Sequence, residues 1–148
     1  MAPVPTFTSI LCPVDFSTSA RHALTVATEL ATSSHAALTI AHVWQPPMPL
    51  YGTPDAAVSG ELIQAMIDDA ERSLADWEAT ARAAGVTSVQ AKMLSGVPWD
   101  EIVKLALSSH ADLVVMGTHG RTGLTHVLIG SVAEKVVRHA PCAVLVVR

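Results

Sequence analysis

Apolar runs alternate with stretches of helical spacing along this chain, and this pattern predicts strands and helices that follow one another in turn. Five short apolar or alternating runs are typical of strands, at residues 8–14, 37–43, 86–94, 112–116 and 142–147. Between them, apolar side chains recur every three or four residues, which predicts helices beginning near residues 20, 59, 99 and 131. Such an alternation predicts a mainly parallel sheet with helices on both of its faces.

The predicted fold class is therefore α/β, in three layers, with a five-stranded parallel sheet in the order 3-2-1-4-5. The apolar fourth and fifth strands fit this fold, because strands covered on both faces are apolar throughout. The order reverses between the first and fourth strands, and ligands of such sheets bind beside that point, at the carboxyl ends of the strands. No repeat or second unit is evident, so we expect a single domain over residues 1–148.

Two segments interrupt the regular pattern. Residues 1–6 are a proline-rich lead-in that we expect to be loose. Residues 44–58 contain four prolines and a glycine, which exclude a helix. A loop of this length is either a functional lid or a surface excursion without a role, and both readings stay open. The helix after it is predicted to bury one continuous face from Leu62 to Trp77.

The glycine-rich segment from Met116 to Ser131 carries the strongest chemical signal. It lies between an apolar strand and a helix, so backbone N–H groups and the positive helix end converge on a small space that suits an anion. Three of its glycines can take a positive φ and let a ligand approach the backbone; they are Gly117, Gly120 and Gly130. The N–H groups from Gly120 to Val132 are predicted to cradle phosphate oxygens.

Side chains in and around this segment extend the anion site. Ser131 can cap the last helix, donate its hydroxyl to a phosphate, or do both. Arg121 offers a charged fork to a phosphate, although a solvated loop charge is an equally good interpretation. Asp15 follows the first strand, at the same edge of the sheet. It either caps the next helix, accepts from ribose hydroxyls, or helps to hold a phosphate-bound Mg²⁺.

The second strand supplies the other half of a nucleotide site. Val43 lies at its end, where its main chain can line an adenine slot, and Met116 can cover the base. Neither the Gly-x-x-x-x-Gly-Lys-(Ser/Thr) loop nor a Gly-x-Gly-x-x-Gly turn after the first strand is present.

Composition narrows the classes of protein further. Half of the 148 residues are hydrophobic and only 4% are aromatic, which predicts a core of small aliphatic side chains. A net charge of −4 without a basic stripe argues against nucleic-acid binding. No apolar run approaches the roughly 20 residues of a membrane span, and residues 1–6 do not resemble a signal peptide, so a cytoplasmic protein is expected. Cys12 and Cys142 are predicted to be buried, reduced thiols, with a disulfide or metal pair as the lesser alternative.

The spacing Gly117-x2-Gly120-x9-Gly130-Ser131 resembles the nucleotide-binding signature of the universal stress proteins. Residues 13–17 and 140–147 also resemble the corresponding segments of that family. The resemblance implies an adenine nucleotide alpha hydrolase-like fold and ATP, with Mg²⁺, at the switch point of the sheet. Carried over by position, Asp15 and Val43 contact the nucleotide, and the three glycines with Ser131 form the phosphate loop.

The resemblance also implies a homodimer that pairs through the last strand, Ala143–Val147. An exposed apolar edge would otherwise invite aggregation, so pairing with a second copy has a physical reason as well. The first functional hypothesis is an ATP-binding regulator of a stress response. The alternatives are a slow Mg²⁺-dependent ATPase or autokinase, for which neither a general base nor an arginine finger is assignable, and a dimeric interaction protein that binds no nucleotide.

Overall fold

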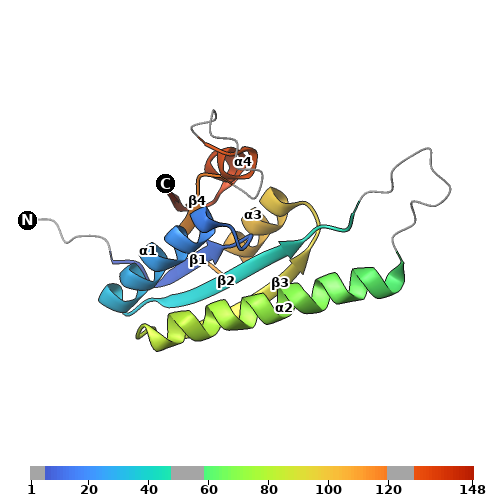
Figure 1. Cartoon of the computed structure of the whole chain (residues 1–148). Coiled ribbons are helices and arrows are strands. Elements are labelled where there is room, and N and C mark those ends of the chain that lie inside the picture. Colours follow the sequence, from blue (N-terminus) through green and yellow to red (C-terminus); the bar gives the residue numbers. More distant parts are fainter. Residues whose placement is uncertain (1–5, 48–58, 120–128) are drawn as a thin grey trace, which may run out of the picture.

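Strands and helices alternate along the chain in the computed structural model, which describes residues 6–47, 59–119 and 129–148 (Figure 1). All four strand pairs are parallel and the sheet order is β3-β2-β1-β4-β5, which confirms the predicted order. The elements are β1 (Ser9–Pro13), α1 (Thr18–Ser34), β2 (Ala37–Trp44), α2 (Gly60–Ala83), β3 (Val89–Ser95), α3 (Pro98–Ser108), β4 (Leu113–Gly117), α4 (Ser131–His139) and β5 (Ala143–Val147).

The helices divide between the two faces of the sheet. Side chains of α1 and α2 pack in one buried cluster and those of α3 and α4 in another. Because successive side chains of a strand point to opposite faces, Ile40 joins the first cluster and its neighbour Ala41 the second. The central strand β1 is buried on both faces, with Leu11 and Cys12 fully inaccessible to solvent. This sandwich holds the carboxyl ends of β1, β2 and β4 in fixed positions.

Two predictions about burial were wrong. The fifth strand is only half-buried, because it lies at the edge of the sheet and pairs with β4 alone; Leu145 is 38% exposed. The first half of α2 does not bury its apolar face either, since it extends past the end of the sheet (Figure 1). Leu62 is 53% exposed and Met66 42%, whereas Leu74 and Trp77, farther along the helix, are buried.

Asp112 joins the amino ends of β1 and β4. Its Oδ2 accepts hydrogen bonds from the N–H and the hydroxyl of Thr8, at 2.8 and 2.9 Å, and its Oδ1 accepts from the N–H of Ser9 at 3.1 Å. Burial alone would raise the pKa of Asp112, but these hydrogen bonds favour the carboxylate and lower the pKa overall. The end of the sheet opposite the strands' carboxyl ends is therefore tied together by a charged group.

Both cysteines are free thiols, as predicted. Burial raises the pKa of the Cys12 thiol to about 12. Cys142 is only partly buried, so its predicted full burial was wrong; burial and the charge of Asp112 raise the pKa of its thiol. None of the helices within the described ranges is long and apolar enough to cross a membrane.

Candidate functional site

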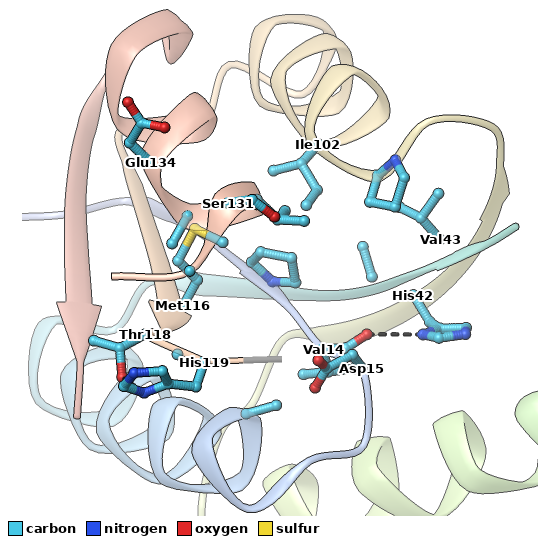
Figure 2. A pocket seen from close by; sticks show the side chains of 18 of the residues that line it. Val14, Asp15, His42, Val43, Ile102, Met116, Thr118, His119, Ser131 and Glu134 are labelled. Carbon is cyan, nitrogen blue, oxygen red and sulfur yellow. Dashed lines mark hydrogen bonds between the residues drawn. The ribbon is translucent and has the colours of Figure 1, made fainter. Parts of the chain in front are cut away.

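A cavity of about 650 Å³ opens at the carboxyl ends of β1, β2 and β4, where the strand order reverses. Its walls come from the turn after β1, the end of β2, the first turns of α3 and α4, and the residues that follow β4 (Figure 2). This is the position at which ligands of such sheets are expected. Most of the lining is apolar, and polar groups converge from β1, β4 and α4.

The structure brings most of the predicted site residues to this cavity. Those that line it are Asp15, Val43, Met116, Gly117, Gly130, Ser131 and Val132. They come from four separate elements, although only the last part of the chain carries the glycine signature. Gly120 and Arg121 lie outside the described residues, so their predicted contacts with phosphate stay predictions.

Asp15 lies in the turn between β1 and α1. Its Oδ1 accepts a hydrogen bond from the N–H of Ser17 at 3.0 Å. The N-cap of α1 is Ser17 itself, whose Oγ accepts from the N–H of Ala20 at 3.1 Å. The capping role predicted as one alternative for Asp15 therefore belongs to Ser17, while Asp15 shapes the turn and lines the cavity.

The glycines serve close packing of the backbone. A Cβ added to Gly117 would lie 2.8 and 2.9 Å from the carbonyl carbon and oxygen of Ser19, and would also collide with its Oγ. A Cβ added to Gly130 would lie 2.7 Å from the carbonyl oxygen of Thr118, which accepts the N–H of Gly130. Neither glycine has a positive φ, so that part of the prediction was wrong. Both are small because another segment of backbone passes beside them.

Helix α4 begins at the cavity. Its N-cap is Gly130, and no side chain of the described residues makes a cap hydrogen bond there, so the prediction that Ser131 caps this helix was wrong. Ser131 is the first helical residue, and its side chain lies among the residues that line the cavity (Figure 2). The first N–H groups of a helix have no partner within it and carry partial positive charge. This end of the cavity is therefore suited to an anion.

The opposite end of the cavity is apolar. Val43 faces Ile102 and Pro98, which lie one turn apart on α3. In a strand, the N–H and C=O of every second residue point to the same neighbour. Because the carbonyl of Ala41 accepts the N–H of Val14 at 2.8 Å, the main-chain groups of Val43 also point to the side of β1, which has ended there. A flat heterocycle could lie between these apolar side chains and bond to that strip of backbone.

Several residues of this site were not predicted. Pro98 and Ile102 lie at the start of the helix predicted from near residue 99, and the sequence did not mark them as residues of the cavity. Their four-residue spacing, after a strand that ends at the same edge, was the signal that could have found them. His42 had no identifiable partner in the sequence. In the structure its Nδ1 lies 2.8 Å from the carbonyl oxygen of Val14 (Figure 2). The spacing of residues along the chain does not predict this contact.

The titratable groups that line the cavity are few. Among the described residues they are Asp15, His42, His119 and Glu134. Nδ1 of His119 lies 2.9 Å from the hydroxyl of Thr118, and Glu134 pairs with Arg138 one turn along α4. In the described part of the chain, no group of three or more His, Cys, Asp or Glu side chains could hold a metal ion. The cavity thus combines an apolar slot, two carboxylates, two imidazoles and a helix N-terminus.

Comparison with known proteins gives consistent matches over nearly the whole chain. The sequence model of the Universal stress protein family matches residues 6–148. A universal stress protein of Methanocaldococcus jannaschii is 37% identical over 147 residues, which cover 96% of this chain and 82% of that protein. The solved structure of universal stress protein UspA from Lactobacillus plantarum has a TM-score of 0.85 at 31% identity, over 98% of this chain and 100% of that one. A crystal structure of a universal stress protein in complex with cAMP has a TM-score of 0.74 at 26% identity, over 97% and 99% of the two chains.

Proposed function

Because the chain belongs to the universal stress protein family, we propose that it binds an adenine nucleotide, preferably ATP with Mg²⁺, in the cavity at the carboxyl edge of the sheet. On this proposal it is a nucleotide-dependent regulator of a stress response that acts in the cytoplasm. Nucleotide occupancy would change the surface that the mouth of the cavity offers to partner proteins. The relative solved in complex with cAMP supports an adenine nucleotide as the ligand class.

The apolar end of the cavity would take the base. Adenine would lie between Val43 and Ile102, with Met116 beneath it, and would bond to the main chain of Val43. Main-chain groups at a strand end are fixed in direction, so they can distinguish donors from acceptors on the edge of a base. Asp15 would then face the ribose hydroxyls, or a Mg²⁺ ion carried by the phosphates.

The phosphates would lie at the N-terminus of α4. The N–H groups after Gly130 and the hydroxyl of Ser131 would donate to their oxygens, in a position where the helix favours negative charge. Gly130 fits this role because it lines the cavity and its backbone approaches Thr118 closely, with no room for a Cβ. The observation that carries the proposal is this convergence of Asp15, Val43 and the start of α4 on one cavity of about 650 Å³.

Calorimetric titration of the purified protein with Mg·ATP tests the proposal, with AMP and cAMP titrated in parallel. We expect binding of ATP that weakens at least tenfold in Asp15→Asn and in Gly130→Ala, as for the loss of one hydrogen bond to a charged group or a displaced loop. Gly60→Ala is the matched control, since a Cβ there meets nothing within 4 Å. Unchanged affinity in both site variants would exclude this cavity as the nucleotide-binding site. Mg²⁺-dependent turnover of ATP that is lost in the Asp15 variant would favour the alternative that the protein is an enzyme.

The proposed assembly is a homodimer through β5. The strand is the edge of the sheet, and Leu145 is 38% exposed on it. A second copy pairing along Ala143–Val147 would cover this edge. Sedimentation equilibrium of Leu145→Lys tests the interface: a monomer is expected, and a variant that stays fully dimeric would exclude it.

A further inference from the structure

His42 is one of the residues that line the cavity, and its side chain points away from the base slot. Neighbouring side chains of β2 alternate in direction, so Val43 packs with the cluster under α3 and α4, while His42 points toward the turn after β1. There its ring lies 4.6 Å from the ring of Phe16, centroid to centroid. Its Nδ1 is 2.8 Å from the carbonyl oxygen of Val14 (Figure 2).

That carbonyl belongs to the peptide that joins Val14 to Asp15. The N–H of Val14 already donates to the carbonyl of Ala41 at 2.8 Å, one residue beyond the last paired residues of β1 and β2. The imidazole of His42 therefore takes the place of a further ladder bond, and both polar backbone groups of Val14 are held by β2. A carbonyl oxygen only accepts, so the imidazole must carry its proton on Nδ1 to make this bond.

The residue after Asp15 is held from the other side. Phe16 has a φ of 64°, a left-handed conformation that a residue with a Cβ adopts only when its surroundings enforce it. The ring of His42 packs on one side of Phe16, and Trp77 of α2 meets it edge-on at 5.3 Å. Arg21 of α1 lies 4.5 Å above the Trp77 ring. Asp15 is thus the one residue between two fixed points, a bonded carbonyl before it and a packed aromatic ring after it.

We infer that His42 is a positioning residue for Asp15: through its Nδ1–H it sets the direction in which the Asp15 carboxylate enters the nucleotide cavity. The inference rests on the proposed function, because it assigns His42 a part in holding the group that meets the ribose or the metal. His42 itself needs no contact with the nucleotide. The groups that surround this unit are the Asp15 carboxylate, the Arg21 guanidinium and the rings of Phe16 and Trp77.

Two substitutions separate the hydrogen bond from the packing. His42→Asn keeps a nitrogen donor near the position of Nδ1 and loses the ring, whereas His42→Phe keeps an aromatic ring against Phe16 and loses the donor. We expect Mg·ATP affinity within about twofold of the wild type for the Asn variant and about five- to tenfold weaker for the Phe variant, as for one lost hydrogen bond. His22→Asn makes the same chemical change on the exposed face of α1 and should leave affinity unchanged. Equal affinities for the Phe variant and the wild type would overturn the inference.

A second measurement decides on His42 without any nucleotide. Long-range ¹H–¹⁵N spectra of the imidazole at pH 8 should show the Nδ1–H tautomer, and the backbone amide shifts of Asp15 and Phe16 should move in His42→Phe and return in His42→Asn. An Nε2–H tautomer, or amide shifts that ignore the Phe substitution, would overturn the inference even if the wild type binds ATP. If the wild type binds no adenine nucleotide, the proposed function fails, while the spectra still decide whether His42 holds the turn.

Discussion

The cavity has two walls that hold their backbone in opposite ways. The aromatic wall, formed by Phe16, His42 and Trp77, packs behind the turn at Asp15, with only His42 of the three in the cavity lining, and fixes that turn by side chains that pack and donate. The glycine wall, formed by Gly117 and Gly130, fixes the end of β4 and the start of α4 by omitting side chains, so that backbone lies against backbone. Removing side-chain atoms should therefore destabilise the aromatic wall, and adding side-chain atoms should destabilise the glycine wall.

The largest effect is expected from Trp77→Ala in the aromatic wall. Trp77 is 5% exposed and supports both Phe16 and Arg21, so its removal leaves a large cavity in the core and should cost about 3–5 kcal/mol of unfolding free energy. Chemical denaturation measures this loss. Leu107→Ala, at a position 64% exposed, is the control and should change stability by less than about 0.5 kcal/mol. A Trp77 variant as stable as that control would mean that the aromatic wall does not hold the turn.

Gly117→Ala should have the next largest effect, because one added methyl group collides with the backbone of Ser19 at 2.8–2.9 Å. Overpacking of this kind costs about 1–3 kcal/mol, measured by denaturation. Ser19→Ala removes only the hydroxyl from the collision, so the double variant should recover part of the loss and not all of it. Gly60→Ala should be neutral or slightly stabilising, since its Cβ has open space at a helix start. Full recovery of stability in the double variant would show that the added methyl group collides with the Ser19 side chain and not with its backbone. The glycine wall would then not depend on contact between two backbone segments.

Asp112→Asn should have the smallest effect, about 1 kcal/mol at neutral pH, from weaker acceptance of the Thr8 and Ser9 hydrogen bonds. The folded state lowers the pKa of Asp112, so its contribution is present above the unfolded pKa of about 4 and is lost as the pH falls through the lower, folded value. The variant should therefore lose less stability than the wild type when the pH is lowered below about 4. Because Asp112 lies at the far end of the sheet, the Asp112→Asn variant should bind Mg·ATP with the affinity of the wild type. A weaker affinity would show that nucleotide binding follows the overall stability of the protein and does not depend on either wall.

The residues of the glycine wall could be predicted from the chain, although their role could not, and the contacts of the aromatic wall could not be predicted. Periodicity gave the alternation of elements and the strand order, which in turn brought Asp15, Val43 and Ser131 to one edge. These inferences need only local spacing and the general geometry of parallel sheets. His42 and Phe16 are 26 positions apart, and their contact depends on a left-handed turn at a residue with no glycine-like signal.

Other predictions were wrong for the same reason, because local spacing does not show which distant segments of the chain meet. The exposed half of α2 satisfies helical spacing at Leu62 and Met66, but spacing does not reveal where the sheet beneath a helix ends. The role of Gly117 was predicted as freedom of φ, whereas the structure shows closeness to Ser19, a residue almost a hundred positions away. The cap of α4 at Gly130 likewise depends on the path of the backbone, which a preference for serine at helix starts does not determine.

The buried thiol of Cys12 can report how often the central sheet opens. This thiol is fully buried in β1, and burial raises its pKa to about 12, so the thiol stays almost entirely protonated at pH 8. Only the thiolate reacts quickly with alkylating reagents, so the folded chain should stay unlabelled at this position until the central strand leaves its neighbours. The rate of labelling at Cys12, counted separately from the partly exposed Cys142 by mass spectrometry of peptides, would then time the opening of the whole sheet. A bound nucleotide would slow the labelling of Cys12 by the factor with which it stabilises the closed protein.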